Sequence, residues 1–147
     1  MKPTPKDWPR ISSSLYYDDA HRAIEWLGKA FGFQLRLKVE GDAGEVIHSE
    51  LTYGDGVIMV SGGRSDPADK KIGFARSPRQ LDGRNTQNLM VYVDDIEAHH
   101  ARAVAGGATI TQPIELHDYG EEHWADRGYG CADCDGHHWW FAERVRG

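Results

Sequence analysis

The chain has 147 residues, and 17 Lys and Arg stand against 23 Asp and Glu, which gives a net charge of −6 at neutral pH. A chain of this length forms one domain, residues 1–147, with a core of its own, and its acidic balance argues against a nucleic-acid partner. The mean hydropathy of −0.62 predicts no membrane span or membrane partner, and two cysteines are too few for a disulfide framework, so we expect a cytoplasmic protein.

Residues from about 10 to 62 predict a first module of one strand, one helix and three further strands. An apolar strand leads into Asp18 and Asp19, either of which is placed to cap the helix that follows. Apolar residues then recur at helical spacing until Gly32 ends the pattern. The three later strands are expected at 33–39, 45–53 and 57–61, separated by turns that contain glycine.

A connecting loop of Gly, Pro, Lys, Arg and Asp follows, from about 63 to 85. A loop this long in a compact domain is usually a lid, an interface contact or disordered. The second module, about 86–143, then repeats the first: the Tyr-x-Asp-Asp pattern beginning at Tyr16 recurs 76 residues later at Tyr92. Its helix is expected to turn His100 toward the core and His99 toward solvent. Its later strands are expected at 109–114, near 125–132 and at 137–142.

This repeat predicts an α+β fold. Two tandem βαβββ modules are expected to form curled mixed sheets around a cavity, with the helices on the outside.

Four segments resemble one known family: YDDAHRAIEWLGKAFGF, HSELTYGDGVIMVSG, VYVDDIEAHHARAVAGGA and DCDGHHWWF. They are similar to the vicinal oxygen chelate superfamily of glyoxalases, extradiol dioxygenases and bleomycin-resistance proteins, and most similar to its PhnB-like branch. The resemblance spans about Ile11 to Phe141. It implies a homodimer, in which the loop at 63–85 is a candidate arm across the interface.

The resemblance also places the superfamily's four metal-ligand positions at Ser12, Met59, Asn88 and Trp140. None of these side chains is a usual ligand of a divalent cation, which prefers imidazole, carboxylate or thiolate donors. We therefore expect no cofactor and no metal centre of the family type, and a divalent metal is kept as the alternative.

Alternation along the predicted strands separates residues that face the helices from residues that face the cavity. The cavity-facing set mixes aromatic, thioether and hydrogen-bonding groups, which suits a small-molecule site. The residues expected to contact a ligand are Tyr16, Met59, Asn88, Met90, Tyr92 and Trp140.

His48 and Glu50 are candidate catalytic residues, because side chains two residues apart on a strand point the same way and either group can accept a proton. They can serve as a general-base pair or as ligands of a metal site unlike the family's. The alternative is a structural hydrogen-bonded pair or a solvated face of the sheet.

Cys131 and Cys134, followed by His137 and His138, have a spacing that is superficially typical of a soft-metal or redox site. The turn between them sends the donors in different directions, so we interpret the cysteines as structural.

The sequence thus favours a protein that binds a small organic molecule in the cavity between its modules. One alternative is a lyase, isomerase or dioxygenase that uses a divalent metal or the pair of His48 and Glu50. Another is a structural or regulatory dimer that binds no ligand.

Overall fold

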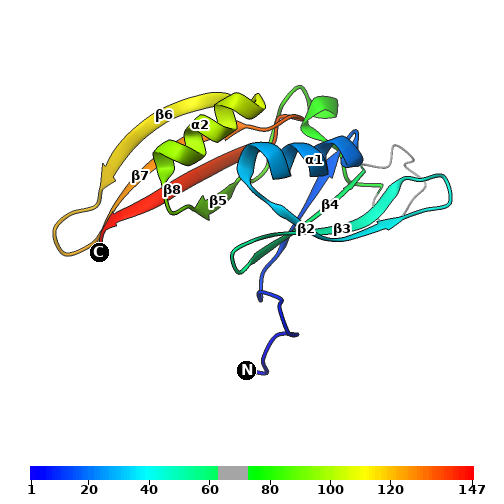
Figure 1. Ribbon diagram of the computed structural model, residues 1–147, viewed down its shortest axis with the longest axis horizontal. Helices are drawn as coiled ribbons and strands as arrows, with labels where there is room; N and C mark the ends of the chain where they lie inside the picture. The colour runs from blue at the N-terminus through cyan, green and yellow to red at the C-terminus, as the bar shows by residue number, and fades with distance from the viewer. Residues whose placement is uncertain (63–72) are drawn as a thin grey trace.

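The computed structural model describes residues 1–62 and 73–147 and consists of two copies of one unit (Figure 1). The first ten residues of the predicted connecting loop, 63–72, lie outside the described residues, and its described part contains one 3-10 turn, Pro78–Leu81. The first unit comprises β1 (Ser13–Tyr17), α1 (Ala20–Phe31), β2 (Gln34–Glu40), β3 (Val46–Tyr53) and β4 (Gly56–Gly62). The second comprises β5 (Leu89–Tyr92), α2 (Ile96–Gly106), β6 (Thr109–Asp118), β7 (Ala125–Ala132) and β8 (His138–Arg146).

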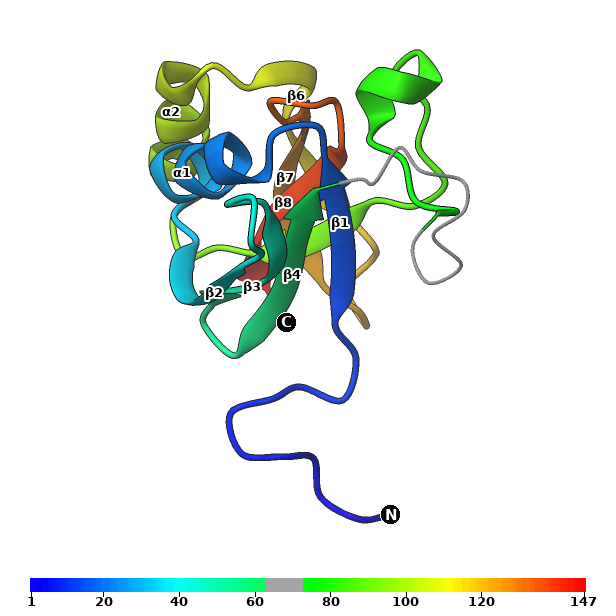
Figure 2. The same cartoon turned by 90° about the vertical axis from the view of Figure 1, so that its right-hand side faces the viewer.

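Each unit forms its own four-stranded mixed sheet. Sheet A has the order β1-β4-β3-β2 and sheet B the order β5-β8-β7-β6, and in each the first strand is parallel to the last strand of its unit. The two helices lie side by side on the same side of the sheets (Figures 1 and 2). The predicted α+β fold of two βαβββ modules is confirmed, although the sheets do not close into a barrel. Within the described ranges, no helix is long and apolar enough to cross a membrane.

The second aspartate of each Asp-Asp pair caps its helix. Asp19 accepts a hydrogen bond from the backbone N–H of Arg22 at 3.1 Å, and Asp95 accepts one from Ala98 at 2.9 Å. These bonds satisfy donors that the first helical turn leaves free. The pseudo-symmetry of the sequence therefore extends to the bonds that start the two helices.

The prediction that His99 faces solvent is wrong, whereas His100 is partly buried as expected. His99 is the buried residue, 7% exposed, and His100 is half-buried with its ring against the edge of Tyr129. The buried stripe passes through Ile96, His99 and Ala103, a spacing of three and four residues that is as helical as the one we expected.

The His99 ring is neutral in this position. Its Nε2 lies 3.0 Å from the carbonyl oxygen of Phe31, which only accepts, so Nε2 carries the proton. Its Nδ1 then accepts from the hydroxyl of Tyr129 at 2.8 Å. Burial lowers the pKa of His99.

Strands β6 and β8 are longer than predicted, since they end at Asp118 and Arg146 rather than at 114 and 142. Pro113 interrupts the strand pattern in the sequence. In the structure β6 is an edge strand with irregular register between Gln112 and Glu115, where a proline is tolerated.

The carboxylate of Asp133 joins the two modules. Its Oδ2 accepts a hydrogen bond from the Tyr17 hydroxyl of the first module at 2.6 Å and from the Trp139 indole at 3.0 Å. Its Oδ1 accepts from the backbone N–H groups of Asp135 and His137 at 3.1 and 3.0 Å. Asp133 is 7% exposed, so four donors satisfy a carboxylate that is almost excluded from water.

Replacing Asp133 with Ala is expected to lower the free energy of unfolding by about 3 kcal/mol or more, because it leaves the buried Tyr17 hydroxyl and Trp139 N–H without partners. Urea titration measures the change. Asp42→Ala, at an exposed position, is the matched control and is expected to stay within about 0.5 kcal/mol of the natural protein. Equal stability of the two variants would contradict the role of Asp133.

His99 is expected to make stability depend on pH. Because its pKa is lower in the folded chain than in the unfolded chain, its stabilising contribution is complete above the unfolded pKa of about 6.5 and is lost as the pH falls below that value. Urea titrations at pH values of about 7.5 and 5.5 test this. His99→Gln is expected to be less stable overall but to lose less stability on acidification. An equal loss in both proteins would show that His99 is not responsible.

Candidate functional site

The side of sheet B away from the helices, called here the open face, carries the indole of Trp140. Its neighbours in β8, Trp139 and Phe141, are buried in the core, so strand alternation turns Trp140 outward. A β-carbon on Gly128 would lie 2.7 Å from Cζ2 of this indole, so glycine is needed for the ring to rest against β7. The indole is therefore fixed on the sheet and only half-buried.

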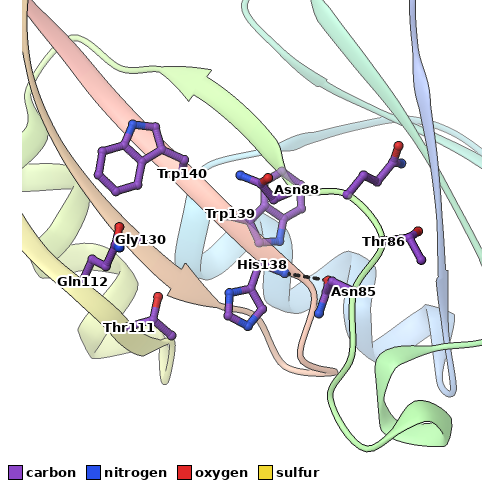
Figure 3. A pocket seen from close by; sticks show the side chains of 10 residues that line it. Asn85, Thr86, Asn88, Thr111, Gln112, Gly130, His138, Trp139 and Trp140 are labelled. Carbon is purple, nitrogen blue, oxygen red and sulfur yellow. Dashed lines mark hydrogen bonds between the residues drawn. The ribbon is translucent and has the colours of Figure 1, made fainter.

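A cavity of about 510 Å³ adjoins this indole. Figure 3 shows it between Trp140, the side chains of β6 and the segment before β5. The backbone N–H of His138 donates to Oδ1 of Asn85 at 3.1 Å and ties that segment to β8. The described residues that form the lining offer amide, hydroxyl, imidazole and indole groups and no carboxylate, lysine or arginine: Asn85, Thr86, Gln87, Asn88, Thr111, Gln112, Gly130, His138, Trp139 and Trp140.

His117 lies beside Trp140, with ring centroids 5.3 Å apart and the rings at 70°. Its Nε2 is buried and has no hydrogen-bond partner among the described residues. The sequence analysis missed this residue because we expected the strand to end before it. Only the continuation of β6 past Pro113 brings His117 to the open face.

Tyr92 lies on the same sheet but its hydroxyl is already bonded. It donates to Oδ2 of Asp126 at 3.0 Å, while Arg144 donates to Oδ1 of the same carboxylate at 2.5 Å and also to the Tyr92 hydroxyl. The Arg144 guanidinium lies 5.2 Å from the ring centroids of both Tyr92 and Trp124. Tyr92 can thus offer its ring to a ligand more readily than its hydroxyl.

His48 and Glu50 contact each other on sheet A, with Nε2 and Oε1 3.1 Å apart. Arg36, which the sequence analysis did not single out, donates from Nε to the other oxygen of Glu50 at 2.9 Å. The hydrogen bond from His48 lowers the pKa of Glu50 most and Arg36 lowers it further, although burial opposes both. Glu50 is therefore an ionised carboxylate with both oxygens bonded.

The N-terminal segment holds Arg36 in place. The guanidinium lies 4.9 Å from the ring centroid of Trp8 and donates to the backbone carbonyl of Asp7 at 2.7 Å. No motif in the sequence links these residues, because the contact depends on where the segment before β1 crosses sheet A.

The residues predicted to contact a ligand are divided among several cavities. Asn88 and Trp140 line the cavity of about 510 Å³, and Met90 and Tyr92 line one of about 350 Å³ between the modules. Tyr16 and Asn88 line a third, of about 450 Å³. None of these three is lined by the predicted catalytic pair on sheet A. That all of these residues share one site stays a prediction.

The positions that correspond to the family's metal ligands do not fit a divalent metal. Ser12, Asn88 and Trp140 offer a hydroxyl, a carboxamide and an indole, and Met59 offers a thioether that lies 4.0 Å from the hydroxyl of Ser14. Over residues 1–62 and 73–147, no three His, Cys, Asp or Glu side chains are grouped to hold a metal ion.

Cys131 and Cys134 are free thiols, one buried and one half-buried. Burial raises the pKa of each thiol to about 12, so neither is a thiolate at neutral pH. The Nε2 of His137 lies 2.8 Å from the carbonyl oxygen of Tyr16, to which it donates, so this nitrogen is not a metal ligand.

Comparison with known proteins identifies the family. The profile of the glyoxalase/bleomycin resistance protein/dioxygenase superfamily matches residues 10–141. An uncharacterised protein from Mycobacterium bovis is 31% identical over 138 residues, which cover 94% of this chain and 85% of that protein.

Solved structures of other proteins have the same fold. TioX from a Micromonospora species aligns with a TM-score of 0.67 and 29% identity over 95% of this chain and 98% of TioX. TnmS3, an antibiotic binding protein from a Streptomyces species, aligns with a TM-score of 0.63 and 15% identity over 91% of this chain and 93% of TnmS3, a likeness of fold alone. The chain therefore belongs to the glyoxalase/bleomycin resistance protein/dioxygenase superfamily.

Proposed function

We propose that this protein binds a small organic molecule on the open face of sheet B, with Trp140 as the stacking surface and without a metal centre of the family type. The observation that carries the proposal is the indole of Trp140 resting over Gly128 beside a cavity of about 510 Å³. An aromatic ring held on a rigid strand offers a flat apolar surface at a small cost in side-chain entropy.

The groups around the cavity indicate the ligand's chemistry. Asn88, Gln112 and Thr111 supply uncharged donors and acceptors, so the site suits a planar ligand with hydrogen-bonding groups at its edge rather than a strongly charged one. That TnmS3, of the same fold, is described as an antibiotic binding protein supports this class of ligand.

A second candidate function is catalysis by a lyase, isomerase or dioxygenase, and the contact between His48 and Glu50 favours it. Glu50 is a weak base when its pKa is lowered and both its oxygens are bonded. The ionised Glu50 instead orients His48, whose Nδ1 is then the group of the pair that can accept a proton. We rank catalysis below binding because the pair lines none of the three cavities described above.

We also infer a homodimer in the cytoplasm and a place in the PhnB-like branch of the superfamily. The segment at His48–Leu51 and the Tyr119-Gly120 pair support the branch, and the family resemblance supports the dimer. Light scattering on the purified protein decides the oligomeric state, since a monomer would have a mass of 16.5 kDa.

Trp140→Ala is expected to abolish or strongly weaken binding of a planar heteroaromatic compound identified by a thermal-shift screen. Since Trp140 is half-buried, the loss of stability is expected to be below the roughly 3 to 5 kcal/mol typical of a core tryptophan. Trp139→Ala, which removes the buried neighbour, is the matched control for such a core loss. A large loss of stability in Trp140→Ala with unchanged binding would place Trp140 in the core and contradict the proposal.

The purified protein is expected to carry no stoichiometric iron, manganese, nickel or zinc, because the family's ligand positions hold Ser12, Met59, Asn88 and Trp140. Elemental analysis by mass spectrometry measures this after expression in medium supplemented with each metal. One tightly bound metal per chain, lost when two or more of these residues are substituted, would overturn the expectation and favour an enzyme.

A further inference from the structure

We propose that a second site, on the helix side of the molecule, binds a small zwitterion such as a free α-amino acid between Asp94 and Arg102. The site is a cleft of about 580 Å³ where α1 ends, β3 ends and α2 begins. It lies where the C-terminal end of α1 adjoins the first half of α2, two helices that Figure 1 shows next to each other. It shares no lining residue with the cavity beside Trp140.

Arg102 is a fixed cation in this cleft. Its Nε donates to the carbonyl oxygen of Lys29 and its Nη2 to that of Gly28, both at 2.8 Å, so the guanidinium caps the last turn of α1. Its Nη1 has no partner among the described residues and faces Gly32, where an added β-carbon would lie 3.0 Å from it. One edge of a positioned guanidinium is therefore open to a ligand.

Asp94 supplies the opposite charge. The neighbouring Asp95 caps α2, whereas the carboxylate of Asp94 is exposed and makes no hydrogen bond or ion pair with any described residue. Asp94 and Arg102 both line the cleft, and among the described residues they form no ion pair with each other.

Tyr53 lines the same cleft as these two charged groups. The negative charge of Asp94 raises the pKa of its hydroxyl, after the larger effect of burial, and the positive charge of Arg102 lowers it. The ring packs against Phe33 at a centroid distance of 5.5 Å, and its hydroxyl has no hydrogen-bond partner in the described chain. The cleft therefore contains an uncharged hydrogen-bonding group as well as an unpaired carboxylate and an open guanidinium edge.

A zwitterion matches this arrangement better than a simple ion. An ammonium group would pair with Asp94 and a carboxylate with Arg102, whereas a ligand of one charge would leave the other protein group unpaired. Gln34 and Thr52, also in the lining, add uncharged hydrogen-bonding groups for the rest of the ligand. His99 does not take part, because both of its ring nitrogens are already bonded.

Isothermal titration with glycine, L-serine, L-glutamine and L-phenylalanine tests the proposal. At least one is expected to bind saturably, and its α-amide and its N-acetyl derivative, which each lack one charge, are expected to bind about tenfold more weakly or worse. Asp94→Asn is expected to cause a similar loss. Asp42→Asn is the matched control, because Asp42 is an equally exposed carboxylate outside the cleft lining.

The proposal is overturned if none of the four amino acids binds, if the N-acetyl derivative binds as well as the free amino acid, or if Asp94→Asn binds as well as the natural protein. If the Trp140→Ala variant still binds the amino acid, the site is independent of the open face of sheet B. If that variant loses amino-acid binding, the proposal of a second site is overturned. Thermal unfolding of Asp94→Asn, which removes no hydrogen bond seen in the structure, verifies that the variant is folded.

Discussion

The buried carboxylate of Asp133 is the constraint on which the arrangement of the two modules depends. A carboxylate excluded from water is costly unless its oxygens are bonded, and here one donor, the hydroxyl of Tyr17, must come from the other module. The modules are therefore held together by a hydrogen bond to a buried carboxylate as well as by apolar packing. Apolar contacts tolerate small shifts, whereas a bond of 2.6 Å between Tyr17 and Asp133 tolerates very little.

The same carboxylate decides which face of β8 carries the candidate site. It accepts the indole N–H of Trp139 and so fixes that ring on the core side, between Phe33 and Phe141. Because side chains alternate along a strand, Trp140 must then point to the open face. A slip of one residue would bury Trp140 and turn Trp139 to the open face.

The sequence predicted the parts of this fold that depend on local patterns. The repeat, the capping aspartates and the division of strand residues into two faces follow from spacing, and Leu15, Tyr17 and Phe141 are buried as their positions in the strands require. The phase of α2 could not be decided, because spacings of three and four residues are both helical and offered either His99 or His100. His117 escaped notice because we expected its strand to end at 114. Arg36 escaped notice because its partner, Glu50, lies on a neighbouring strand whose register the sequence does not specify.

The register also explains why the two modules present different chemistry on the same backbone. Met59 pairs with Glu50 in sheet A, and Trp140 pairs with Gly130 in sheet B. Glu50 is therefore equivalent to Gly130 of the second module. His48, two residues earlier, is equivalent to Gly128.

The side chains at these positions of β3 and β7 determine which side chain fits on the paired strand, β4 or β8. In sheet A an imidazole and a carboxylate fill the space above the strand, and the facing residue is a flexible methionine. In sheet B, Gly128 has no side chain in that space, and the indole of Trp140 lies there. Next to Gly130 lie Thr111 and Gln112. A polar pair and an aromatic stacking surface are therefore alternatives at one structural position. The duplicated fold contains both, because the two modules have different residues at these equivalent positions.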